Sequence, residues 1–176
     1  MPGESTAVRN SQMAVFTNPP VLDADADLST PLDRTGGVPG TWVRARPGPR
    51  PVTDTGVTLY VHGGGFAHSN PPMERIMAHR LSLATGRPAF AVDYRLAPAH
   101  PFPAAVEDVV AVHRSLLEQG VPASRILFAG ESAGGTLALS ALLVLAAAGD
   151  PLPAGPWRCR RSPTSPPRPR RRPATT

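Results

Sequence analysis

The 176-residue sequence predicts an α/β fold with a mostly parallel sheet and flanking helices. From Thr41 onward, short apolar runs alternate with longer segments of helical periodicity, the order that builds β-α-β units. Glycine or proline stands at the boundaries of most of these segments. The chain has 41% hydrophobic residues, and its length is sufficient for one domain with a sizeable core.

Four short runs are predicted to be strands. Residues 41–45 (TWVRA) have the pattern of an edge strand, and residues 56–61 (GVTLYV) form a strand that runs into three glycines. Residues 88–95 (PAFAVDYR) and 125–130 (RILFAG) are the next two strands, and the last of these leads to Ser132. Helical segments separate these strands, as the crossovers of a parallel sheet require.

Three longer segments are predicted to be helices. Residues 71–86 open on two prolines and close on Gly86. The predicted buried face of this helix consists of Ile76, Met77, Leu81 and Leu83. Residues 101–120 have apolar positions and one histidine at helical spacing, namely Val106, Val109, Val110, His113, Leu116 and Leu117. Residues 133–148 are apolar nearly all round, which predicts burial between the sheet and other structure.

The two ends of the chain differ from the central part, residues 41–155. Residues 1–40 are polar and turn-rich, and we expect a flexible arm or the remnant of a small cap. Residues 156–176 are rich in Arg and Pro, which predicts a disordered tail. Seven of the 18 arginines follow Trp157, so the body of the chain is mildly acidic although the formal net charge is +5.

The sequence has no feature of a secreted or membrane protein. Residues 1–20 lack a cationic run followed by an apolar stretch, and the longest apolar segment is shorter than the roughly 20 residues that span a bilayer. The single Cys159 cannot form an internal disulfide. We therefore expect a soluble, cytoplasmic protein with no membrane partner, and the sequence does not predict an oligomeric state.

The stretch FAGESAGGT, residues 128–136, contains the pattern G-x-S-x-G. A predicted strand precedes the pattern and a predicted helix follows it, the context in which such a serine lies at the tip of a sharp turn. Small residues on both sides leave room for a strained backbone there. This context predicts that Ser132 is a nucleophile, whereas the pattern without it would more often be an ordinary loop.

The stretch HGGGF, residues 62–66, also follows a predicted strand. Consecutive glycines let backbone N–H groups approach a ligand and face a developing negative charge. A glycine turn without a ligand and a phosphate-binding loop are the alternatives, but the lysine of a phosphate-binding loop is absent. We expect His62 to be a structural hydrogen-bonding residue.

Taken in order, HGGGF, DYRLAPAHPFPAA (residues 93–105) and GESAGG (residues 130–135) resemble the hormone-sensitive-lipase family of α/β-hydrolase esterases. The resemblance covers about residues 41–155 and implies the N-terminal part of an α/β-hydrolase fold, incomplete at its C-terminal side. Ala99 stands where the family usually has Glu, which puts a local ion pair in doubt.

The resemblance also implies roles for individual residues. Ser132 would be the nucleophile, and the N–H groups of Gly64, Gly65 and Ala133 would form the oxyanion hole. Four further residues would hold the loops in place near the site without touching the acyl group, namely His62, Asp93, Arg95 and Glu131.

The usual partners of a catalytic serine are missing. In α/β-hydrolases the triad acid and histidine follow the serine along the chain. All five histidines precede Ser132, and Asp150 is the only acidic residue after it. His68, on the loop beside the glycines, is the nearest substitute base, although a loop histidine is more often just solvated.

The tail has two interpretations. It contains no aliphatic residue larger than Ala, so it cannot form the next buried strand. GC-rich DNA read out of frame yields such a composition, and restoring one base in a GC-rich back-translation of residues 155–161 gives the apolar run GAVALSP. We favour a frameshifted or truncated esterase over a functional arm that contacts nucleic acid.

The sequence as a whole predicts a serine carboxylesterase that hydrolyses small acyl esters through an acyl-enzyme at Ser132, with no metal and no organic cofactor. Its substrate would be a small-molecule ester, and we do not expect the protein to bind nucleic acid. The alternative is a non-catalytic ligand-binding or interaction protein with a basic tail that contacts nucleic acid.

Overall fold

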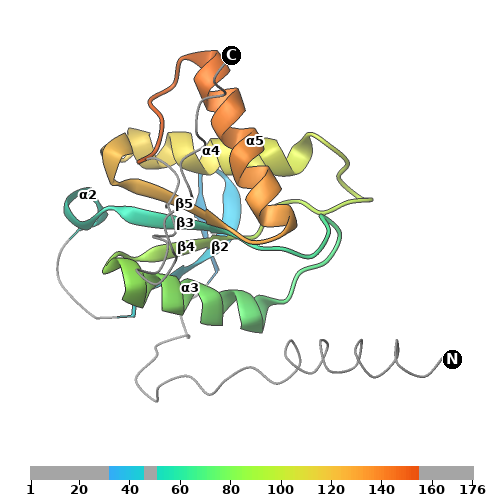
Figure 1. Cartoon of the computed structure of the whole chain (residues 1–176), viewed down its shortest axis with the longest axis horizontal. Coiled ribbons are helices and arrows are strands. Elements are labelled where there is room, and N and C mark those ends of the chain that lie inside the picture. The colour runs from blue at the N-terminus through green and yellow to red at the C-terminus, as the bar shows by residue number, and fades with distance from the viewer. Residues whose placement is uncertain (1–31, 46–50, 155–176) are drawn as a thin grey trace, which may run out of the picture.

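A computed structural model of the chain describes residues 32–45 and 51–154 (Figure 1). These residues form one five-stranded mixed sheet with the strand order β1-β2-β4-β3-β5. One helix covers one face of the sheet and two helices cover the other (Figure 1). The predicted arm before residue 32 and the predicted tail after residue 155 lie outside the described residues.

The antiparallel part of the sheet contains a hairpin that was not predicted from the sequence. Strand β1 (Leu32–Thr35) pairs with β2 (Val38–Val43) through a turn at Gly36 and Gly37, both with positive φ. The sheet therefore begins before the expected boundary at residue 40. The expected edge strand at 41–45 is the end of β2, which lies between β1 and β4 and is not at the edge.

The parallel part of the sheet consists of three strands. They are β3 (Val57–Val61), β4 (Ala89–Val92) and β5 (Ile126–Gly130), at the positions that the sequence predicts. Val61 is in register with Val92 on one side and with Gly130 on the other. The loops that follow these strands therefore leave the sheet at the same edge, where ligands bind in sheets of this kind.

The helices pack on both faces of the sheet. Helix α3 (Pro71–Thr85) lies on one face, and α4 (Ala104–Glu118) and α5 (Ala133–Ala148) lie on the other (Figure 1). The short helix α2 (Val52–Thr55) precedes β3, and the 3-10 turn η1 (Ala123–Arg125) precedes β5. The predicted burial of Leu83 was wrong, because α3 packs through Ile76 and Ala78 and leaves Leu83 exposed.

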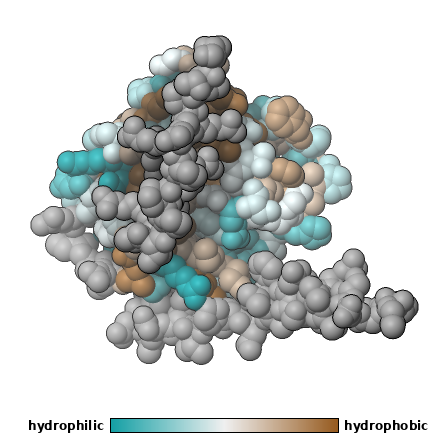
Figure 2. Space-filling view, viewed as in Figure 1, coloured by the Kyte–Doolittle hydropathy of each residue, from teal (hydrophilic) through white to brown (hydrophobic). Residues whose placement is uncertain are grey.

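Helix α5 is only partly covered within the described residues. Its inner face, with Leu137 and Leu145, is buried against the sheet, but Leu139, Leu143 and Val144 on the outer face are exposed. Apolar residues gather around this helix in the upper part of Figure 2. The expectation that structure covers both sides of α5 is therefore not met by residues 32–45 and 51–154.

The chain returns toward the sheet after α5. Ala154 forms an isolated parallel bridge with Leu127 of β5, and its N–H donates to the Ile126 carbonyl at 2.9 Å. At Ala154 the chain therefore runs parallel to β5, as a further strand beside β5 would. None of the helices in the described part of the chain is long and apolar enough to cross a membrane.

His113 of α4 is completely buried and packs against β5. Its Nε2 lies 2.9 Å from the Pro151 carbonyl, to which it donates, and its ring meets Phe128 edge-on at 5.4 Å between centroids. Burial lowers the pKa of His113, because the charged imidazolium loses its hydration inside the protein.

The lowered pKa of His113 predicts a loss of stability in acid. As the pH falls below about 6.5, the unfolded chain binds a proton at this residue that the folded chain does not. The free energy of unfolding should therefore fall, at a rate of up to about 1.4 kcal/mol per pH unit from this group. Urea titrations at several pH values should show a smaller fall for His113→Gln, which keeps an N–H donor. Equal pH dependence in the two proteins would contradict this account.

Candidate active site

Ser132 lies in the turn between β5 and α5, as the sequence predicts. Its φ is 49° and its ψ is −121°, a conformation that L-residues rarely adopt. Such a strained turn is typical of a nucleophile elbow, and Ser132 is exposed. Two glycines permit the turn, because a Cβ on Gly130 would lie 2.5 Å from the Gly134 carbonyl oxygen and one on Gly134 would overlap the Val61 carbonyl.

The glycine loop after β3 packs directly against this turn. A Cβ on Gly63 would lie 3.3 Å from both the Ser132 Cβ and the Glu131 carbonyl oxygen. Gly64 has φ of 108° and Gly65 has φ of 62°, so both use conformations that favour glycine. Two motifs that are far apart in the sequence, HGGGF and GESAGG, are therefore brought together at one edge of the sheet.

Three backbone N–H groups lie at this junction without an acceptor among residues 32–45 and 51–154. Within the described residues, no backbone or side-chain acceptor takes a hydrogen bond from the N–H of Gly64, Gly65 or Ala133. Ala133 is the first residue of α5, whose N-terminus carries a partial positive charge. Free donors at such a place can stabilise an oxyanion, and each donor contributes about 3 kcal/mol in characterised hydrolases.

The His62 side chain contacts the glycine loop and the residues around it. Its Nδ1 lies 2.6 Å from the Gly63 carbonyl, so Nδ1 carries the proton, and 3.5 Å from Glu74 Oε1. The ring stacks on Tyr94 with centroids 4.2 Å apart, and the Tyr94 hydroxyl donates to the His62 carbonyl at 2.9 Å. Burial raises the pKa of Tyr94 to about 12, so this donor stays protonated at neutral pH. These contacts support the expected structural role of His62.

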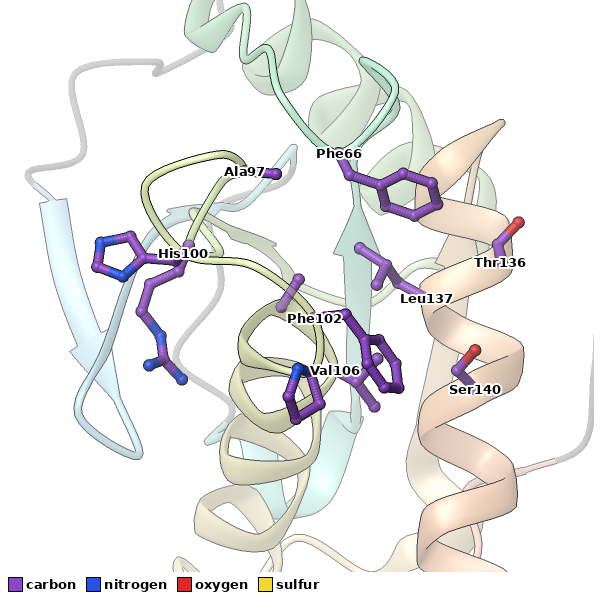
Figure 3. A pocket seen from close by; sticks show the side chains of 11 residues that line it. Phe66, Ala97, His100, Phe102, Val106, Thr136, Leu137 and Ser140 are labelled. Atoms are coloured by element: carbon purple, nitrogen blue, oxygen red, sulfur yellow. The ribbon is translucent and has the colours of Figure 1, made fainter.

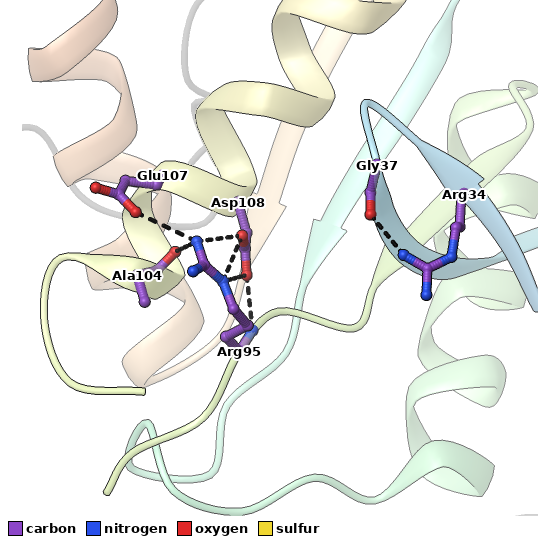
Figure 4. Close-up of polar contacts among 6 residues, drawn as sticks. All are labelled: Arg34, Gly37, Arg95, Ala104, Glu107 and Asp108. Atoms are coloured by element: carbon purple, nitrogen blue, oxygen red, sulfur yellow. Dashed lines mark hydrogen bonds and ion pairs between the residues drawn. The ribbon is translucent and has the colours of Figure 1, made fainter. Parts of the chain in front are cut away.

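Arg95 anchors the loop between β4 and α4 (Figure 4). Its backbone N–H and Nε donate to Asp108 at 2.8 Å and 2.9 Å, and its Nη2 lies 3.2 Å from Glu107 Oε2. Hydrogen bonds to Asp108 are the main cause of the raised pKa of Arg95. The role of Asp108 was not predicted from the sequence, although a carboxylate among the apolar positions of α4 was the available signal.

The other two residues with expected supporting roles lie close to the same edge. Asp93 follows β4, and its N–H donates to the Pro39 carbonyl at 2.9 Å. The Glu131 carboxylate accepts a hydrogen bond from the Tyr60 hydroxyl at 3.2 Å. Burial and the nearby Glu131 charge raise the pKa of Tyr60 well above its usual value.

No general base contacts Ser132 within the described residues. No hydrogen bond joins its hydroxyl to a histidine or carboxylate there. His68 is exposed and lines a cavity of about 280 Å³ with Glu131 and the glycine loop, but Ser132 does not line that cavity. Asp150 pairs with Arg114 at 2.7 Å beyond the far end of α5, about 27 Å along the helix from Ser132.

A family model of the alpha/beta hydrolase fold matches residues 58–159, which is more than half of the chain. The chain belongs to the alpha/beta-hydrolase-fold family. Within this family it is similar to an acetyl-hydrolase of Streptomyces hygroscopicus, with 48% identity over 114 residues that cover 61% of this chain and 38% of the relative. It is also similar to the esterase LipI of Mycobacterium tuberculosis, with 37% identity over 61% of this chain and 35% of LipI.

Solved structures of this hydrolase family agree with the fold. An esterase from the bacterial hormone-sensitive lipase family is 41% identical, with a TM-score of 0.69 over 82% of this chain and 46% of that chain. The structure of EstE5 soaked with p-nitrophenyl butyrate is 35% identical, with a TM-score of 0.69 over 87% of this chain and 50% of EstE5. The chain thus spans at most half the length of these relatives.

Proposed function

We propose that the chain carries the nucleophilic half of a serine esterase that hydrolyses small carboxylic esters. The observation that carries this proposal is the strained φ and ψ of Ser132, beside three backbone N–H groups that have no acceptor within the described residues, two on the glycine loop and one at the start of α5. The names of the relatives, an acetyl-hydrolase and several esterases, support the same reaction class.

In the proposed reaction, the Ser132 hydroxyl oxygen attacks the ester carbonyl carbon. The carbonyl oxygen becomes an oxyanion, which the N–H groups of Gly64, Gly65 and Ala133 stabilise. When the carbonyl re-forms, the bond to the alcohol breaks, and the alcohol leaves with the proton that Ser132 has lost. Water then attacks the acyl-enzyme and releases the carboxylic acid. No step requires a metal or an organic cofactor.

The proton of Ser132 has no acceptor among the described residues, so acylation by this chain should be slow and dependent on hydroxide. Hydrolysis of p-nitrophenyl butyrate should rise steadily with pH, without the inflection near about 6.5 that a histidine base gives. An inflection that disappears in His68→Asn would instead identify His68 as the base. Initial rates across the pH range distinguish these outcomes.

Replacement of the nucleophile tests the proposal itself. Ser132→Ala should remove the part of p-nitrophenyl butyrate hydrolysis that proceeds through an acyl-enzyme, because no hydroxyl remains at the turn. Ser69→Ala is the matched control, since Ser69 is an exposed serine on the loop that follows the glycines. Equal rates for the wild type and Ser132→Ala at alkaline pH would overturn the proposal.

A further inference from the structure

The glycine loop is held by hydrogen bonds to its carbonyl groups. Its peptide bonds are trans, so the C=O and N–H groups of each peptide point in opposite directions. His62 Nδ1 lies 2.6 Å from the Gly63 carbonyl oxygen, and this contact orients the Gly64 N–H. The Gly64 carbonyl accepts from the His68 N–H at 3.0 Å, which orients the Gly65 N–H. The directions of both candidate oxyanion donors on this loop therefore depend on contacts of the carbonyl in the same peptide.

The rest of the loop is attached to two other segments of the chain. Figure 3 shows Phe66, which directly follows the glycines, beside Ala97 of the loop after β4, where both residues line an apolar cavity. The Ala97 N–H donates to the Phe66 carbonyl at 2.9 Å. The loop ends at Asn70, the N-cap residue of α3. Its position therefore depends on the segment after β4 and on the start of α3.

One carboxylate oxygen on α3 contacts both ends of the loop. Glu74 Oε1 accepts a hydrogen bond from the Asn70 N–H at 2.6 Å, and the same oxygen lies 3.5 Å from His62 Nδ1. The Glu74 side chain is only 12% exposed, although it lies near the start of a helix on the protein surface. Glu74 thus connects residue 62, where the loop begins, with residue 70, where it ends. No role for Glu74 was predicted from the sequence.

The start of α3 itself does not use the Glu74 carboxylate. Pro71 and Pro72, the first two residues of the helix, have no N–H group that needs an acceptor. The Met73 N–H is capped by Asn70 Oδ1 at 3.4 Å, and the Glu74 N–H donates to the Asn70 carbonyl. The hydrogen bond to the Glu74 carboxylate comes from Asn70, the residue before the helix. This bond therefore holds the loop to α3.

We propose that Glu74 is a positioning residue: through His62, it orients the Gly64 N–H toward the oxyanion. The inference rests on the proposed acylation of Ser132. The Glu74 oxygen favours a proton on His62 Nδ1, the nitrogen that donates to the Gly63 carbonyl. His62 Nε2 is buried and has no hydrogen-bond partner among the described residues, so a proton there would lack an acceptor. This role requires an acceptor oxygen at the right distance, and a negative charge is not needed.

The test compares two substitutions of Glu74 by the rate at which the full chain is labelled with the p-nitrophenyl ester of an alkylphosphonate. The Ser132 oxygen bonds to phosphorus, nitrophenolate leaves, solvent takes the serine proton, and the phosphoryl oxygen stands in for the oxyanion. Glu74→Gln keeps an acceptor oxygen at the same distance, so its rate constant at saturating reagent should stay within about twofold of the wild type. Glu74→Asp keeps the charge but is one methylene shorter, and its rate constant should fall about tenfold to hundredfold.

Asn70→Ala is the matched control. It removes the side chain that caps Met73 but keeps the backbone N–H that donates to Glu74. Its rate constant per labelled chain should equal that of the wild type, although α3 is less stable without its cap. If Glu74→Asp is no slower than Asn70→Ala, Glu74 only stabilises the helix and the inference is wrong. If Glu74→Gln is as slow as Glu74→Asp, the negative charge is required, which also contradicts the inference.

Residual dipolar couplings separate this inference from the proposed function, because they report the direction of an N–H bond without any reaction. In ¹⁵N-labelled Ser132→Ala, adding Glu74→Asp should change the coupling of Gly64, and adding Glu74→Gln should not. The couplings of α4 should be the same in all of these proteins. If the wild type reacts with no phosphonate, the proposed function fails and the couplings still decide the role of Glu74. If the wild type is labelled but Glu74→Asp has the same rate or the same Gly64 coupling, Glu74 does not position the donor and the role of Ser132 stands.

Discussion

Gly134→Ala should lower the free energy of unfolding by about 3 kcal/mol and remove reaction at Ser132. A methyl group at position 134 would overlap the carbonyl oxygens of Val61 and His62, which belong to the backbone of β3 and the glycine loop. Backbone atoms cannot rotate away as a flexible side chain does, so α5 or the glycine loop must move. Either movement separates Ser132 from the N–H groups of Gly64 and Gly65.

The matched control is Gly135→Ala, one residue further along α5. A Cβ there would lie 3.5 Å from the Gly130 carbonyl oxygen, which is ordinary van der Waals contact. Because alanine favours the helix over glycine by about 1 kcal/mol, this variant should be as stable as the wild type or slightly more stable. Urea unfolding of both variants, and labelling of their Ser132 by the p-nitrophenyl ester of an alkylphosphonate, check the prediction. If Gly134→Ala and Gly135→Ala lose similar amounts of stability and labelling, the close approach of Gly134 to Val61 and His62 is not the cause of the loss.

Asp108→Ala should lower the free energy of unfolding by about 2–3 kcal/mol, since a buried carboxylate that accepts several hydrogen bonds is lost. The Asp108 side chain is 9% exposed and accepts from both the backbone and the side chain of Arg95. The loop that this contact holds also bonds to Phe66 through Ala97. In Asp108→Ala, labelling of Ser132 by the p-nitrophenyl ester of an alkylphosphonate should therefore be slower than in the wild type.

Glu107→Ala is the control for Asp108→Ala. Glu107 contacts the same guanidinium at 3.2 Å, but its side chain is 61% exposed. An exposed ion pair is screened by water, so this variant should change the stability by less than about 0.5 kcal/mol. Thermal melts of both variants make the comparison. A large loss of stability in Glu107→Ala, or no loss in Asp108→Ala, would contradict the prediction that the buried carboxylate of Asp108 stabilises the protein more than the exposed one of Glu107.

Local signals were sufficient to predict the elements of the parallel part of the fold. Helix α3 begins at Pro71 and ends before Gly86, which adopts the left-handed conformation expected after a helix. Strands β3 and β5 were predicted because their apolar runs end at glycines. Each signal lies within the element or beside it, so the sequence alone was enough.

Features that depend on distant contacts were harder to predict. The hairpin of β1 and β2 was missed because Pro39 and Gly40 lie inside β2, where such residues usually argue against a strand. Leu83 has helical spacing with the buried positions of α3, and only the packing of α3 on the sheet shows that it is exposed. The pairing of Arg95 with Asp108 links the end of a strand to a helix, so no local pattern reveals it.

Ser132 as the nucleophile of an acyl transfer is the central claim, and the site of covalent modification tests it most directly. The full chain is treated with the p-nitrophenyl ester of an alkylphosphonate and digested with trypsin, which cleaves after arginine. The peptide 126–158 contains Ser132 together with Thr136 and Ser140. Fragment ions in the mass spectrum then distinguish these three hydroxyls.

The account predicts one phosphonyl group per chain, located on Ser132, and no such group in Ser132→Ala. It also predicts that Ser69→Ala is labelled as fully as the wild type. A phosphonyl group on any other residue of the wild type, or equal labelling of Ser132→Ala, would contradict the account.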